Sequence, residues 1–189
     1  MHAIPGPELQ LRRSVSERVL RIEPLDGFTP TIGRLVGMLT YARQTTLAAV
    51  DGLGIPELDH LHDAKSNSIG ALLAHIAVVE RAYHCLTFED RVPSPEEDAA
   101  WGPALKLGDA ARHSLRGRPL EHYVRDLAEA RRVTLEGLAA RDDAWLEQTL
   151  RVAPALNAHW AWFHVAEDEI NHRGQIRWLR ARVGGAVSA

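Results

Sequence analysis

Apolar residues recur with the period of an α-helix in four long segments of this chain. Their spacing of three and four residues predicts helices over about 31–50, 67–87, 120–140 and 157–183. Glycine and proline residues separate these segments. The long connection between the second and third segments contains two shorter helical patterns, near 96–101 and 107–115. No alternation of apolar and polar residues stands out, so the pattern indicates no β-strand.

Four long helices joined by one long crossover are typical of an all-α fold. We therefore predict a four-helix bundle in which the crossover connects the second and third helices. A chain of 189 residues is the size of one domain. We expect the bundle to occupy residues 30–185, with a glycine pair at its end as a helix cap. Residues 1–29, which include Pro24 and Gly27, are expected to form an N-terminal arm.

Composition and charge narrow the functional classes. The formal net charge of −3 provides no basic surface, so we expect no nucleic-acid partner. The single cysteine, Cys85, excludes an internal disulfide and a cysteine-rich zinc site. Neither a signal peptide nor an apolar run of the ~20 residues that cross a bilayer is visible. We therefore expect a cytoplasmic protein with no membrane partner.

The last predicted helix carries polar residues where a core-facing stripe should be apolar. At ~3.6 residues per turn, His164, Asp168 and His172 fall near the middle of one stripe, spaced i, i+4, i+8. The other members of that stripe are Ala161, Val165, Gln175, Ile176, Leu179 and Val183. His75 lies at the centre of an apolar face of the second predicted helix. Two facing helices thus present imidazoles and a carboxylate towards the expected core.

A divalent metal ion held by His75, Asp168 and His172 would explain this pattern. Burying these groups without partners is unfavourable by several kcal/mol, and bundle cores often build metal sites from facing helices. Nitrogen and carboxylate ligands suit zinc, nickel, iron or manganese, of which we name zinc first. Two alternatives without a metal stay open: a core histidine bonded to another group, and a simple ion pair between Asp168 and His172.

Three further residues are candidates near such a site. Arg131 falls on the inward stripe of the third predicted helix, where its guanidinium could bind a carboxylate of a cofactor or substrate. An ion pair with a neighbouring acid, or a side chain that reaches solvent, would explain it equally. His164 could orient a ligand or replace one. Gln175, one turn beyond the ligands, could hydrogen-bond a bound water.

Two segments resemble the DinB/YfiT-like superfamily: HIAVVE at 75–80 and HVAEDEINHRGQIRWLR at 164–180. The sharpest motif is His172-Arg173-Gly174-Gln175 with an acidic or histidine ligand one turn earlier. The resemblance implies a four-helix bundle with a three-ligand metal site, often in dimers. Many members carry a histidine where this chain has Asp168, so it resembles a variant with two histidines and one carboxylate.

The resemblance also implies a chemical activity. Relatives in this superfamily include S-transferases and isomerases that use mycothiol, bacillithiol or glutathione. It therefore implies a metal-dependent thiol S-transferase, in which a low-molecular-weight thiol attacks an electrophile and the protein needs no catalytic cysteine. The sequence assigns no catalytic residue beyond the three ligands. A metal-dependent hydrolase and a non-catalytic metal-binding stress-response protein stay open. A homodimer is implied too, and the tryptophan and phenylalanine residues of the last predicted helix fit one.

Overall fold

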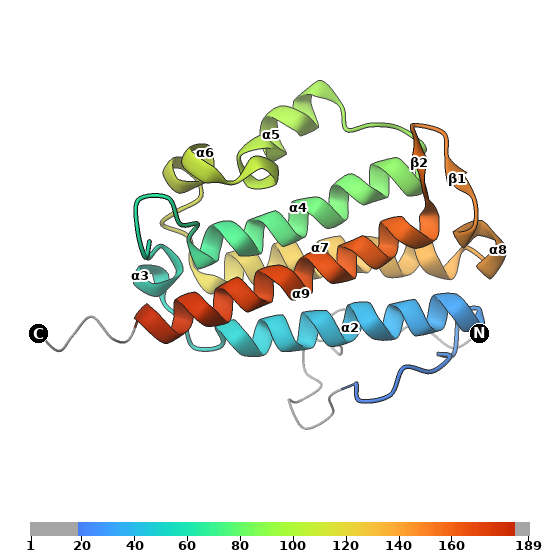
Figure 1. Cartoon of the computed structure of the whole chain (residues 1–189), viewed down its shortest axis with the longest axis horizontal. Coiled ribbons are helices and arrows are strands. Elements are labelled where there is room, and N and C mark those ends of the chain that lie inside the picture. The colour runs from blue at the N-terminus through green and yellow to red at the C-terminus, as the bar shows by residue number, and fades with distance from the viewer. Residues whose placement is uncertain (1–18, 184–189) are drawn as a thin grey trace, which may run out of the picture.

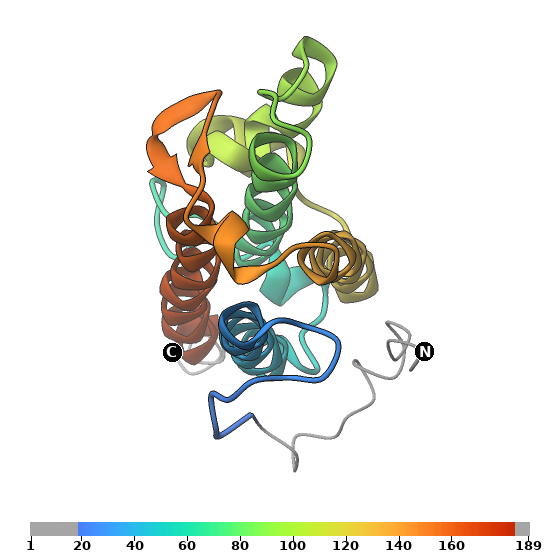
Figure 2. The ribbon, with the colours of Figure 1, turned by 90° about the vertical axis from the view of Figure 1, so that its right-hand side faces the viewer.

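Four long helices form the body of the molecule in a computed structural model that describes residues 19–183 (Figure 1). They are α2 (Pro30–Val50), α4 (Ile69–Thr87), α7 (Leu120–Ala139) and α9 (Ala158–Val183). Seen from one end, α9 lies between α2 and α4, and α7 packs beside α4 on the opposite side (Figure 2). The predicted all-α bundle is confirmed, and the predicted ends of these helices agree within two residues.

Shorter elements connect the long helices. The crossover between α4 and α7 contains α5 (Pro95–Lys106) and α6 (Gly108–Ser114), which cover the outer side of α4 (Figures 1 and 2). The remaining short elements are α3 (Ile55–Leu58), α8 (Asp143–Leu146), β1 (Thr149–Leu150) and β2 (Ala153–Asn157). β1 and β2 pair antiparallel, with Thr149 opposite Asn157. The sequence pattern missed this hairpin because β1 is too short to show an alternation.

The N-terminal side of the bundle is partly described. Residues 19–29 precede α2, and the backbone N–H of Val19 donates to Gln44 Oε1 of that helix at 3.2 Å. Residues 1–18 of the predicted arm, and the glycine pair predicted to cap the last helix, lie outside the described residues. The proposed boundary between arm and bundle therefore stays a prediction.

A distant carboxylate caps the start of α2. The side chain of the N-cap residue makes no capping bond, and Asp143 of α8 accepts hydrogen bonds from the backbone N–H groups of Thr31 (3.0 Å) and Ile32 (3.1 Å). The hydroxyl of Thr29 also donates to it, at 2.5 Å. The Thr29 hydroxyl, together with these backbone donors, lowers the pKa of Asp143 to about 2. A charge on α8 thus satisfies exposed donors at the N-terminus of α2.

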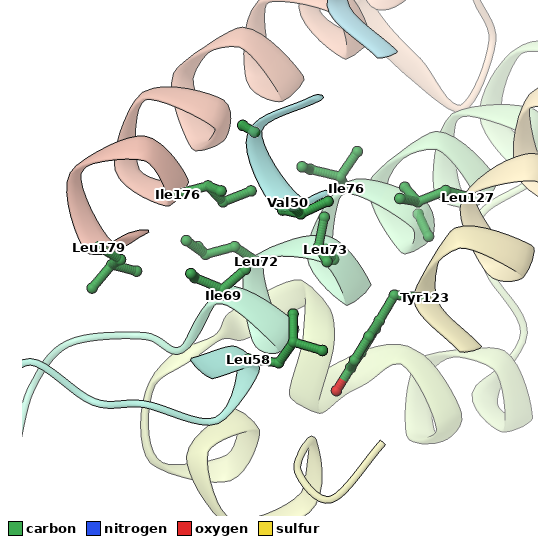
Figure 3. Close-up of a cluster of buried hydrophobic side chains, with 12 residues drawn as sticks. Val50, Leu58, Ile69, Leu72, Leu73, Ile76, Tyr123, Leu127, Ile176 and Leu179 are labelled. Atoms are coloured by element: carbon green, nitrogen blue, oxygen red, sulfur yellow. The ribbon is translucent and has the colours of Figure 1, made fainter. Parts of the chain in front are cut away.

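Apolar side chains fill the end of the bundle beside α3 (Figure 3). The fully buried members include Leu58, Leu72 and Ile176, from three different elements. Tyr123 of α7 enters the same cluster, and a Cβ at position 70 would lie 2.6 Å from its hydroxyl oxygen. Gly70 therefore leaves the space that this tyrosine occupies.

A buried layer of four charges crosses the middle of the bundle, and each long helix contributes one residue. Its members are Arg43, Glu80, Arg131 and Glu169, which we call the charge layer. Arg43 donates to Glu169 (2.8 Å) and to Glu80 (2.9 Å). Arg131 donates to Glu80 (2.7 Å) and to Glu169 (3.2 Å). Two positive and two negative groups therefore neutralise one another inside the core.

Backbone carbonyls complete the charge layer. Arg43 of α2 donates to the carbonyl of Leu127 on α7 (2.6 Å), and Arg131 of α7 donates to the carbonyl of Leu39 on α2 (2.7 Å). Each arginine thus bonds the carbonyl four residues before the other arginine. Burial alone would raise the pKa of Glu80, but the two guanidinium groups outweigh it and lower that pKa to about 2.

The second long helix, α4, is apolar and long enough to cross a membrane by length and composition. This contradicts the expectation that no such run exists. Of its most apolar window, 61% is buried inside the molecule, and α4 packs against α7, α9 and α5. That burial is the pattern of a core helix, and it explains the high hydropathy.

Candidate metal centre

Three side chains from two helices converge beside the bundle core. His75 comes from α4, and Asp168 and His172 come from successive turns of α9. Asp168 Oδ1 lies 3.6 Å from Nε2 of His75 and 3.3 Å from Nε2 of His172. One ligand atom from each residue lies within 4.8 Å of the other two. The structure thus brings together the three residues that the sequence pattern selects.

The spacing of these atoms fits a shared cation better than hydrogen bonds. Nitrogen–oxygen hydrogen bonds usually measure ~2.7–3.2 Å, and both separations exceed that range. In a tetrahedral zinc site with metal–ligand bonds of ~2.0–2.2 Å, neighbouring ligand atoms are about 3.4 Å apart. The separations of 3.3 and 3.6 Å bracket that value. The three residues present therefore fit a metal of this kind.

Hydrogen bonding orients the ligands. Nδ1 of His75 lies 2.8 Å from the backbone carbonyl of Ala104 in α5. A carbonyl only accepts, so Nδ1 carries a proton, and Nε2, which faces Asp168, is the nitrogen left to bind a metal. Metal-binding histidines commonly donate their second ring N–H in this way. Among residues 19–183, the buried Oδ2 of Asp168 and Nδ1 of His172 have no hydrogen-bond partner.

The site is largely enclosed and electrostatically polarised. The side chains of His75, Asp168 and His172 are 12%, 15% and 13% exposed. Burial by itself would raise the pKa of Asp168, but the neighbouring imidazoles of His172 and His75 hold it well below its usual range. Burial opposes protonation of His75, yet Asp168 and the Ala104 carbonyl raise its pKa above the ordinary value. A negative carboxylate thus lies between two nitrogen donors, which favours a bound cation.

The sequence model of the mycothiol S-transferase family matches residues 34–185 of this chain. The chain belongs to that family. Its membership of the DinB/YfiT-like superfamily is thereby confirmed. The match covers most of α2 and all of the other three long helices, and it includes the three residues of the candidate centre. No curated protein matches the chain as a relative.

The centre of this S-transferase family member lies at the α4–α9 seam under α5, which corrects the expectation of a site deep between the four helices. The buried residues of α9 surround Glu169, so its core-facing stripe is centred one residue, or ~100°, from Asp168. Glu169 belongs to the charge layer. His75 bonds α5 because the crossover covers the outer side of α4.

Arg131 belongs to the charge layer and is not free to bind a substrate, a role that the sequence had allowed. All three of its guanidinium nitrogens donate to Glu80, Glu169 or the Leu39 carbonyl. The ion-pair alternative is the one that the structure shows. The sequence analysis did not identify Glu80 and Glu169 as partners of Arg131. The presence of arginines on inward helix faces was the available signal, since a buried arginine needs a buried acid as its partner.

The two other candidates remain on α9 beside the ligands. Gln175 is exposed, one turn after the ligand cluster. His164 lies one turn before Asp168, and its Nδ1 is 3.0 Å from Glu167 Oε2. Its ring packs against Tyr83 of α4, with centroids 5.8 Å apart. His164 thus faces the same seam between α4 and α9 as the candidate metal centre.

Proposed function

We propose that this protein is a metal-dependent thiol S-transferase whose metal is held by His75, Asp168 and His172. The observation that carries the proposal is a carboxylate oxygen 3.3 and 3.6 Å from two imidazole nitrogens, in a chain of the mycothiol S-transferase family. We propose zinc as the resident metal. Nickel, iron and manganese accept the same ligand types, and the composition of the isolated protein distinguishes them.

The chain supplies the ligands, their orientation and an enclosed site, and the small thiol supplies the nucleophile. A bound zinc ion would lower the pKa of a coordinating thiol and leave a position for it beside three protein ligands. Cys85 does not compete as a nucleophile, because it is buried and burial raises the pKa of its thiol. We propose mycothiol as the thiol, with bacillithiol and glutathione as the tested alternatives, and a small organic electrophile as the second substrate.

Elemental analysis of the isolated protein tests the metal. We expect close to one zinc per chain in the wild type, and its loss in His172→Ala and Asp168→Asn. His159→Ala is the matched control, because His159 lies on the same helix with its Nδ1 3.9 Å from Glu147, away from the three ligands. Retention of one metal per chain in both ligand variants would exclude this site.

A thiol panel tests the reaction. Metal-loaded protein is assayed with mycothiol, bacillithiol and glutathione against monochlorobimane and an epoxide. We expect turnover with mycothiol, and its disappearance in His172→Ala. Turnover of ester or amide substrates without any thiol would favour the hydrolase instead. Tight metal binding with no turnover of any kind would favour the non-catalytic stress-response protein.

We also propose that the protein is a cytoplasmic homodimer produced in response to electrophile stress. Phe163, Ile170 and Trp178 of α9 are each more than a third exposed, and a second copy of the chain would cover them. Sedimentation at micromolar concentration should give a dimer, which Ile170→Glu weakens. A wild-type monomer, or a transcript that does not rise after treatment with an electrophile, contradicts the respective part of this proposal.

A further inference from the structure

A histidine outside the candidate ligand set lies in the same seam. His164 precedes Asp168 by four residues, a rise of about 6 Å along the helix axis. Its ring meets the Tyr83 ring of α4 edge-on and stacks on Trp160, with centroids 4.9 Å apart and planes inclined by 11°. The contact with Tyr83 turns the imidazole towards α4, which also carries His75. With 33% of its side chain exposed, His164 is accessible from solvent.

Glu167 sets the protonation pattern of this imidazole. Its Oε2 lies 3.0 Å from Nδ1 of His164, and its Oε1 accepts from Asn171 Nδ2 at 3.1 Å. The carboxylate can only accept, so Nδ1 carries the proton and Nε2 presents its lone pair. Among residues 19–183, none bonds Nε2. An imidazole with one nitrogen held by a carboxylate and the other free is suited to proton transfer.

Stability does not account for this arrangement. Exposed ion pairs one turn apart on a helix contribute little to folding. Such a pair also leaves unexplained why the ring is held between Trp160 and Tyr83. The half-buried phenol of Tyr83 lies against the His164 ring, and burial together with the charge of Asp168 raises the pKa of its hydroxyl to about 12. Tyr83 therefore keeps its proton at neutral pH and is a hydrogen-bond donor on the same side.

We propose that His164 is the general base and acid of the thiol transfer, with Glu167 as its positioning residue; this rests on the proposed function. With an epoxide as electrophile, Nε2 of His164 takes the proton of the thiol. The sulfur forms a bond to an epoxide carbon, the carbon–oxygen bond breaks, and its electron pair passes to the oxygen. That oxygen takes the proton from His164, and the Tyr83 hydroxyl donates a hydrogen bond to it. The product is a hydroxy thioether, and the imidazole is again neutral.

The test compares full-length, zinc-loaded variants with mycothiol and styrene oxide. His164→Gln should lower kcat about 10²–10⁴-fold, the usual contribution of a general acid–base group, with little change in KM. Protonation of a general base lowers kcat at low pH, and this fall of wild-type kcat should vanish in the variant. Glu167→Gln should lower kcat less and change the pH at which kcat falls, because it removes the charge that faces Nδ1 of His164. His159→Gln is the matched control and should match the wild type in kcat and pH profile.

Zinc content and circular dichroism provide readouts that do not depend on turnover, and both should be unchanged in His164→Gln. Loss of zinc from this variant would make His164 a ligand and overturn the proton-transfer role. A kcat within twofold of wild type, a retained fall at low pH, or a rise in KM alone would also overturn it. If any of these results were found, thiol-dependent turnover by the wild type would still support the proposed function. A zinc-loaded wild type inactive with every thiol would overturn both.

Discussion

Replacing Glu80 with glutamine tests how strongly the charge layer holds the bundle together. The substitution keeps the size of the side chain but removes its charge, so that Arg43 and Arg131 share only Glu169. Glu80 is fully buried, and water cannot replace the missing charge. Removing one partner of a buried ion pair costs about 3–5 kcal/mol. The free energy of unfolding of a whole domain is only ~5–15 kcal/mol. We therefore expect the substitution to remove a large part of the stability.

The pKa of Glu80 gives a second value for the stability that its charge contributes. Folding lowers this pKa from 4.5 to about 2, so the unfolded chain binds the proton more readily. The carboxylate therefore contributes fully above about pH 4.5, and its contribution is lost as the pH falls through about 2. At ~1.4 kcal/mol per pKa unit, the two values correspond to about 3 kcal/mol at neutral pH. This agrees with the lower end of the cost expected for breaking the layer.

Urea unfolding in the presence of EDTA measures the effect without metal. At pH 7 we expect Glu80→Gln to unfold about 3 kcal/mol more easily than the wild type, and the difference should shrink at pH 3. Glu129→Gln is the matched control, since Glu129 forms an exposed pair with Arg132 and should change stability by less than ~1 kcal/mol. Equal stabilities of the two variants at pH 7, or a difference that does not depend on pH, would refute the reasoning.

Three further predictions follow from local contacts. Gly137→Ala should destabilise the fold by roughly 1–3 kcal/mol, because its Cβ would overlap the Phe88 ring, and adding Phe88→Leu should restore part of the loss in urea unfolding; no recovery would locate the strain elsewhere. Asp143→Asn should lower the melting temperature at pH 7 and have little effect below about pH 2, where the wild-type carboxyl is protonated too; a shift of equal size at both pH values would exclude the charge as its cause. Zinc at 1,000 times its Kd should stabilise the wild type by about 4 kcal/mol in thermal unfolding, but not His75→Gln; an equal shift in both would place the ion elsewhere.

The long helices and the convergence of His75, Asp168 and His172 could be predicted from the sequence alone. Most helix ends can be predicted because glycine or proline residues lie near them, and Ser68 caps the start of α4. The pairing of Asp168 with His172 can be predicted because residues at i and i+4 project side by side on any helix, whatever its rotation in the bundle. The third residue, on another helix, can be predicted because His75 lies on an apolar face of the second helix.

The rotation of α9 and the layer inside the bundle could not be predicted in this way. Apolar and polar residues alternate so evenly around α9 that its inward direction could be centred on Asp168 instead of Glu169. On α4 the difficulty was the opposite one: α5 and α6 bury a second side, so an apolar face did not identify the bundle interior. Ion pairs such as Arg131 with Glu80 join residues far apart in the chain, and helical periodicity contains no information on such partners.

The bond from His75 to the carbonyl of Ala104 has an evolutionary consequence. Every amino acid provides a main-chain oxygen, so substitutions in α5 can preserve the direction of the imidazole as long as they preserve the helix and its close packing. The sequence of the crossover can therefore change while the direction of the His75 imidazole beneath it is kept. In such an arrangement, the surroundings of the candidate metal centre can vary without a change in its three residues.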